Sequence, residues 1–143
     1  MSQLDDPIIE RTADLEMDVD QLWELISTAD GWRSWLVDDT DVVVSPGATG
    51  AATEDGIERE VQVDTVTEGH TIGFSWWRRD EPSCGSYVQL DIVELPHGGS
   101  QLHISERFFS TTPTATMSAA ATMSWDVRMV SLWLLALHST VMA

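Results

Sequence analysis

Hydrophobic and polar residues alternate with two different periods along this chain. Residues 9–17 alternate with the two-residue period of a strand, whereas residues 19–36, V-D-Q-L-W-E-L-I-S-T-A-D-G-W-R-S-W-L, carry apolar residues at helical spacing. Val19, Leu22 and Ile26 would share one face of a helix. The pattern predicts one strand followed by two short helices.

The middle of the chain predicts only strands. Asp55-Gly56 is a two-residue hairpin signal between strand-like runs, and Glu68-Gly69 and the segment 96–99 mark further short turns. Connections this short favour an antiparallel meander. The expected strands after the helices are residues 42–44, 49–54, 57–66, 70–77, 86–95 and 101–109.

Past Pro113 the spacing of apolar residues changes to that of one long helix. One stripe of this helix is expected to face the sheet, formed by Met117, Ala121, Trp125, Arg128 or Met129, Leu132 and Ala136. Towards the end, leucines occupy adjacent positions all round the helix, more than one buried face needs. This excess indicates a second helix packing there, and another subunit is one source of such a helix.

Composition narrows the class of protein. The 143 residues fit one domain, 1–143, and 24 acidic against seven basic residues give a formal charge of −17, with no lysine. The negative electrostatic field of such a chain repels the phosphate backbone of nucleic acid. No apolar run approaches the length of a membrane span, and the first residues lack a signal-peptide pattern, so we expect a cytoplasmic protein without membrane insertion. The single cysteine, Cys84, is given no role.

Residues for metal, nucleotide or nucleophilic chemistry do not gather in any known motif. There is no H-E-x-x-H, no cysteine pair, no G-x-S-x-G and no phosphate-binding glycine loop, and the four histidines do not converge. The acidic run 38–41 lacks the glycine and terminal glutamate of a calcium loop and is expected to be a solvated turn. We therefore expect no cofactor and no metal.

The order of strand, helix pair, six strands and long helix resembles the START-like, or SRPBCC, superfamily. Within it, the chain looks like the bacterial proteins similar to the C-terminal domain of the Aha-type activator of heat-shock protein 90 ATPase. The resemblance rests on strand 9–17, the segment V-x-x-L-W-E-L-I-S-x-A-D-G-W-x-x-W, the strand I-G-F-S-W-W at 72–77, the strand Q-L-H-I-S-E-R at 101–107, and the helix with Trp125, Arg128 and Leu132.

This resemblance implies an α+β helix-grip fold, in which a curved antiparallel sheet of about seven strands grips the last helix. It also implies that an apolar ligand can occupy the space between that helix and the sheet, and that only some members, such as polyketide cyclases, are enzymes. Roles in stress response or regulation, and as a chaperone accessory, follow from the Aha-type resemblance.

Strand alternation predicts which side chains face that space. Arg11, Arg59 and Glu106 fall on an otherwise apolar face, and because a buried charge is costly unless paired, Glu106 is expected to meet Arg59 or Arg11. Such a pair either satisfies itself or orients a polar group of the ligand. The candidate ligand-binding residues are Trp32, Trp35, Arg59, Phe74, Trp76, Leu90, Glu106, Trp125 and Met129.

The tryptophans divide into two groups. Those expected in the core are Trp23, Trp76, Trp125 and Trp133, whereas Trp32 and Trp35 either line a ligand or only pack. Trp77 points to the other face of its strand and could mark a contact surface.

Three functions remain open from the sequence. The favoured one is a module that binds a small apolar or aromatic molecule, as a binding protein and not as an enzyme. The second is a protein-interaction module whose partner is a chaperone, a regulator or a second copy of the chain. The third is a cyclase of the polyketide type, for which Glu106 with Arg59 or Arg11 are the titratable candidates.

Overall fold

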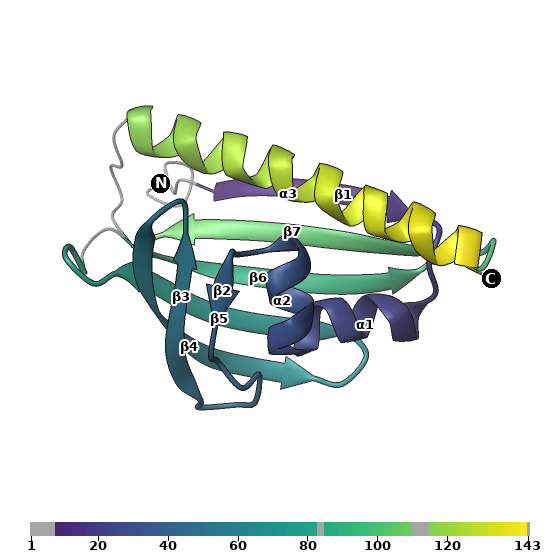
Figure 1. Ribbon diagram of the computed structural model, residues 1–143, viewed down its shortest axis with the longest axis horizontal. Coiled ribbons are helices and arrows are strands. Elements are labelled where there is room, and N and C mark those ends of the chain that lie inside the picture. Colours follow the sequence, from purple (N-terminus) through teal and green to yellow (C-terminus); the bar gives the residue numbers. More distant parts are fainter. Residues whose placement is uncertain (1–7, 83–84, 110–114, 143) are drawn as a thin grey trace, which may run out of the picture.

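The structure is a computed structural model that describes residues 8–82, 85–109 and 115–142, and, in the last helix, the side chains of residues 123–137. Its elements follow the predicted order, with three helices and seven strands in these residues (Figure 1). The helices are α1 (Val19–Ser27), α2 (Ala29–Trp35) and α3 (Ala115–Met142). The strands are β1 (Ile8–Leu15), β2 (Asp39–Thr40), β3 (Thr49–Glu54), β4 (Ile57–Thr67), β5 (Thr71–Arg78), β6 (Gly85–Glu94) and β7 (Ser100–Phe108).

One antiparallel sheet contains all seven strands in the order β1-β7-β6-β5-β4-β3-β2. The expected meander is therefore confirmed for β2 to β7, and the last strand, β7, also pairs with the first strand, β1. The β3–β4 turn has positive φ at both Asp55 (53°) and Gly56 (79°), as a type I′ turn requires. Register shifts between Val63 and Thr65, and such a bulge increases the local bend of the sheet.

All three helices lie on the same side of the sheet (Figure 1). α3 runs along β1 and packs against β1 and α2, while α1 and α2 cover the strands beside it. The core lies between these layers. Its strand residues are those that alternation predicts to face inward, including Val61, Val63, Ile72, Phe74, Trp76, Val88, Leu90, Leu102 and Ile104, all buried. The α+β architecture, with a long helix across a curved sheet, is confirmed.

The first two helices share a single capping residue. Thr28 Oγ1 accepts a hydrogen bond from Gly31 N at 2.9 Å, at the start of α2, and donates to the Glu24 carbonyl oxygen at 2.7 Å, at the end of α1. At the other end of α1, Asp18 and Gln21 form a capping box. Polar side chains thus define both ends of α1 and the start of α2.

One strand lies elsewhere than predicted. Residues 42–44 are not in a strand, and β2 precedes them at Asp39–Thr40. Beyond β2 the Asp41 carboxylate accepts the Ala51 N–H at 2.8 Å, so a side chain takes the place of a backbone carbonyl and the ladder ends. Val42 is still buried, whereas Val43 is exposed.

The inward stripe of α3 is confirmed for the residues whose side chains are described. Trp125, Arg128, Leu132 and Ala136 are buried. Of the two alternatives at the middle of the stripe, Arg128 is the one that faces in, and Met129 is only partly buried at its edge. Met117, Ala121 and Cys84 lie outside the described residues.

Two tryptophans differ from the core prediction. Trp133 is 56% exposed, because α3 is apolar on both faces and its inward stripe passes through Leu132 instead. Trp23 is only partly buried at the edge of the core. None of the helices in the described ranges is long and apolar enough to cross a membrane.

The closest approach of α2 to α1 depends on a glycine. A Cβ on Gly31 would lie 2.5 Å from the carbonyl oxygens of both Glu24 and Leu25, which are backbone atoms that cannot move aside cheaply. Gly31→Ala is therefore expected to lower the free energy of unfolding by about 1–3 kcal/mol in a urea titration, as overpacking does.

Gly73→Ala is the matched control, since a Cβ there meets its nearest neighbour, in Thr65, at an ordinary 3.5 Å. Equal midpoints for the two variants would contradict the close approach of α1 and α2.

Candidate functional site

Charged and aromatic side chains meet inside the molecule at one end of the sheet, between α3 and the β3–β4 hairpin. We call this group the Trp76 cluster. It consists of Glu54, Arg59, Trp76, Ser86, Glu106, Trp125 and Arg128, contributed by β3, β4, β5, β6, β7 and α3.

Glu106 is the buried acceptor of the cluster. Only 5% of it is exposed. Trp125 Nε1 donates to its Oε1 at 2.7 Å, and Trp76 Nε1 donates to its Oε2 at 3.3 Å. The Ser86 hydroxyl donates to the same Oε2, and itself accepts from Trp76 Nε1 at 3.0 Å. Three donors thus stabilise the carboxylate, and no arginine of the described residues forms a direct ion pair with it.

The predicted pairing of Glu106 with Arg59 or Arg11 is wrong. Arg59 lies on β4, three strands from β7, and its guanidinium pairs with Glu54 instead. Arg11 lies on the edge strand β1, and its Nε reaches outward to Asp126 on α3 at 3.1 Å. The donors from β5, β6 and α3 are nearer to Glu106 and replace the arginine.

Glu54 is the carboxylate that binds the arginines. Arg59 Nη1 lies 3.4 Å from Glu54 Oε1, and Arg128 approaches both carboxylate oxygens, through Nη2 to Oε1 and through Nε to Oε2 at 3.3 Å. Arg128 Nε also donates to the Leu36 carbonyl oxygen at 2.9 Å. With its side chain 3% exposed, Arg128 joins α3 to the hairpin and to the end of α2.

Both guanidinium groups lie against tryptophan rings. Arg59 Cζ is 4.5 Å from the centre of the Trp76 ring, and Arg128 Cζ is 5.3 Å from it and 4.5 Å from that of Trp125. Burial, and then the positive charge of Arg128, lower the pKa of Arg59 from its ordinary value, while Glu54 and Glu106 oppose this shift. Two carboxylates therefore balance two guanidinium groups.

Of the predicted ligand-binding residues, the structure brings Arg59, Trp76, Glu106 and Trp125 together. Phe74 joins them through its ring, whose centre is 5.2 Å from that of Trp76 and 4.7 Å from that of Trp32. Leu90 lies in the core, four residues along β6 from Ser86, and Met129 lies at the edge of the core.

Trp32 and Trp35, on α2, pack against the end of α1. Their Nε1 atoms donate to the carbonyl oxygens of Ile26 and Leu25 at 2.8 and 2.9 Å, and both side chains are buried. Trp35 also lies near Trp125, with ring centres 6.5 Å apart. Their indole N–H groups are therefore used within the protein. Trp77 is half-buried on the other face, against Phe109.

Sequence reasoning missed Glu54, Ser86 and Arg128 as site residues, although a signal for each was present. Arg128 is predicted only as one of two alternatives on the inward stripe of the last helix. Glu54 is two residues from the buried Ala52 on the same face of β3, and Ser86 precedes Val88 and Leu90 on the inward face of β6. Alternation along each strand would have placed both of these strand side chains, Glu54 and Ser86, on the inward face.

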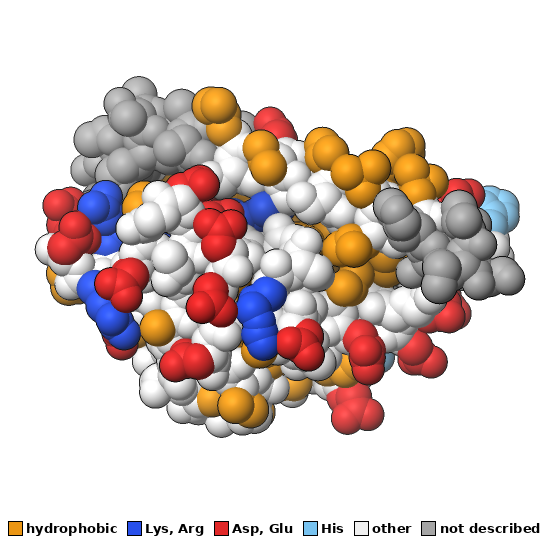
Figure 2. All heavy atoms as spheres, viewed as in Figure 1, with side chains coloured by type: hydrophobic (Ala, Val, Ile, Leu, Met, Phe, Trp, Pro, Cys, Tyr) orange, Lys and Arg blue, Asp and Glu red, His pale blue; other side chains and the backbone are white. Residues whose placement is uncertain are grey.

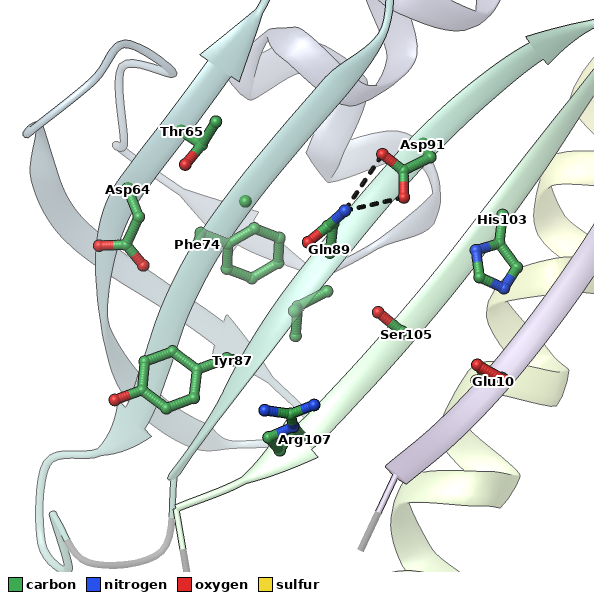
Figure 3. Close-up of a pocket in the computed structure, with 12 residues that line it drawn as sticks. Glu10, Asp64, Thr65, Phe74, Tyr87, Gln89, Asp91, His103, Ser105 and Arg107 are labelled. Carbon is green, nitrogen blue, oxygen red and sulfur yellow. Dashed lines mark hydrogen bonds between the residues drawn. The ribbon is translucent and has the colours of Figure 1, made fainter. Parts of the chain in front are cut away.

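Two surface depressions lie away from this cluster. One, of about 430 Å³, lies on the face of the sheet opposite the helices, where Tyr87, Gln89, Asp91, His103, Ser105 and Arg107 surround it (Figure 3). The other, of about 630 Å³, lies between the start of α1 and the β6–β7 turn. In the described residues, no three His, Cys, Asp or Glu side chains gather to hold a metal ion.

No protein-family model and no curated protein sequence matches the chain. Solved structures do match. MLL2253 from Mesorhizobium loti superposes with a TM-score of 0.79 at 19% identity, over 90% of this chain and 95% of that one. The chain has the helix-grip fold.

Two other helix-grip structures resemble it. The Aha1 dimer from Colwellia psychrerythraea has a TM-score of 0.72 at 15% identity, over 90% of this chain and 95% of that one. DynU16, encoded in the dynemicin biosynthetic locus, has a TM-score of 0.77 at 16% identity over 89% of this chain. The chain spans only 46% of DynU16.

The hydrogen bonds of Glu106 generate a test of the cluster. Glu106→Gln retains one acceptor oxygen but puts an amide N–H₂ where indole and hydroxyl donors converge. A buried donor facing a donor is expected to lower the free energy of unfolding by about 1–3 kcal/mol in urea denaturation.

Glu94→Gln, at the exposed end of β6, is the control. A loss for Glu106→Gln no larger than that of the control would show that the carboxylate is not fixed by these donors.

Proposed function

We propose that the chain binds a small apolar or aromatic molecule between α3 and the sheet, at the end where Arg59 and Glu54 reach the surface. The observation that carries the proposal is the position of Arg59. Its guanidinium lies against the Trp76 ring, its side chain is 24% exposed, and its hydrogen bond to Glu54 is long, at 3.4 Å.

Arg59 has donors to spare for a ligand. A guanidinium carries five N–H groups, and Glu54 accepts from one of them. Arg128, in contrast, is buried and held by Glu54 and Leu36, so it positions Glu54 and does not face the surface. A carboxylate, enolate or phenolate oxygen on a ligand would complete the hydrogen bonds of Arg59.

The apolar part of the ligand would contact aromatic rings. The rings of Trp32, Phe74 and Trp76 form a connected series that runs from α2 to the Arg59 end of the sheet. Because these rings are buried, an aromatic molecule would enter beside Trp76 by displacing neighbouring side chains, with its polar group fixed by Arg59. Apolar sites with a few placed polar atoms commonly bind ligands in this way.

The cluster fits binding better than catalysis. Its two carboxylates and two guanidinium groups balance one another, and Glu106, the group that a cyclase would use as acid or base, already has three donors. The cyclase alternative is supported only by the fold that the chain shares with DynU16, from the dynemicin biosynthetic locus.

A protein-interaction role is the second candidate, and one observation favours it. The outward face of α3 bears large exposed apolar side chains, and the similar structure of Aha1 is that of a dimer. A chaperone-accessory or regulatory role would use such a surface. This role and ligand binding at the Trp76 cluster use different faces of α3.

Native mass spectrometry of protein purified without detergent tests ligand binding directly. The expected spectrum shows excess mass that denaturation releases as one small apolar or aromatic molecule. For binding in solution, anilinonaphthalene sulfonate, an aromatic anion, serves as the probe, and Arg59→Met is expected to weaken its binding roughly 10-fold, because a charge-assisted hydrogen bond is lost.

Arg33→Met is the control, since Arg33 pairs with Asp30 on the surface of α2. The proposal fails if the protein carries no ligand and the probe binds wild type and Arg59→Met equally.

A further inference from the structure

The outward face of α3 carries a continuous apolar stripe. Its members, 38 to 68% exposed, are Met123, Val127, Val130, Leu134 and Leu137. We call this set the α3 stripe. The successive spacings of four, three, four and three residues are those of a seam between two helices packed side by side. Trp133, more than half exposed, lies beside it. Figure 2 shows orange side chains gathered along α3.

The stripe is separate from the face that α3 uses within its own chain. Trp125, Arg128, Leu132 and Ala136 bury that inner face against the sheet and α2. A helix that is apolar on both faces normally has both faces covered. The domain itself covers one of them, so the second face fits another helix.

Charge favours a second copy of the chain as the occupant. In the described part of α3 the charged side chains are Asp126, which pairs with Arg11, and Arg128, which is buried with Glu54. The stripe is therefore uncharged, on a chain with a formal charge of −17. Two such copies repel one another over most of their surfaces, and an uncharged face is where they can approach.

The area of the stripe is sufficient for a dimer. At roughly 100 Å² for each large side chain that is about half exposed, the stripe and Trp133 present about 600 Å² per copy, or about 1,200 Å² for a pair. This value is at the lower bound of the area that stable protein interfaces bury.

We infer that α3 packs antiparallel against α3 of a second copy, about a two-fold axis near Val130. The stripe is nearly symmetric about this residue, so Met123 would meet the partner's Leu137 and Val127 the partner's Leu134. Each pair combines two apolar side chains, and the smaller valines at the centre let the helices approach closely. An antiparallel arrangement also opposes the two helix dipoles favourably.

The oligomeric state in solution tests this inference. By light scattering during gel filtration, wild type is expected at twice 15.9 kDa. Val130→Glu would place two like charges at the apolar centre and raise the dissociation constant of the dimer roughly 100-fold. Val43→Glu, which adds the same charge at another exposed valine, should remain a dimer. Far-UV circular dichroism should be the same for all three proteins.

Cross-linking tests the arrangement independently of Val130→Glu. In a Cys84→Ser background, a mixture of Met123→Cys and Leu137→Cys should form disulfides between the two variants, whereas a parallel pair would link each variant to itself. A monomeric wild type at every concentration, or a dimer that Val130→Glu leaves intact, would overturn the inference. A monomer would assign the stripe to a different protein partner. Neither result bears on ligand binding by Arg59.

Discussion

The position of α3 over the sheet depends on two neighbouring polar contacts. Trp125 donates to the buried Glu106 at 2.7 Å, and Arg128, one turn further along, binds Glu54 and the Leu36 carbonyl oxygen. Apolar packing alone has little directional preference, whereas these hydrogen bonds are satisfied at one position of the helix only. Among the described residues, every buried side-chain nitrogen and oxygen atom has a hydrogen-bond partner. The same contacts form the wall of the candidate ligand site, so fold and site share their polar groups.

Much of the fold could be predicted because period and turn chemistry are local properties. Alternation placed Phe74, Trp76 and Glu106 on the inward face, and Asp55-Gly56 located the hairpin. The partners of Glu106 could not be predicted, because alternation shows which face a side chain is on but not which side chains of α3 and the neighbouring strands reach it: Trp125 and Ser86 do, whereas Arg59 pairs with Glu54. Trp133 was misplaced for a related reason, since a helix that is apolar on both faces does not reveal which face the sheet covers.

The cluster around Trp76 is electrically balanced and has one arginine at its edge. Its charges balance, which keeps the interior stable without a ligand, yet Arg59 lies at the edge where an additional acceptor can reach it. The interior is thus already held together by Arg128 and Glu106, and under the proposed function the partly exposed Arg59 would make the polar contact with the ligand. Selectivity for a ligand would then depend on one guanidinium and the rings beside it.

The shared cap at Thr28 has a mechanical consequence. Because one hydroxyl ends α1 and begins α2, and the indole groups of Trp32 and Trp35 donate back to α1, the two helices form a braced corner. α2 cannot swing away from the sheet without breaking contacts to α1. Widening of the interior without opening this corner would require displacement of α3, which would break the contacts of Trp125 and Arg128. A partner seated on the α3 stripe would add a restraint on that helix from its outer side.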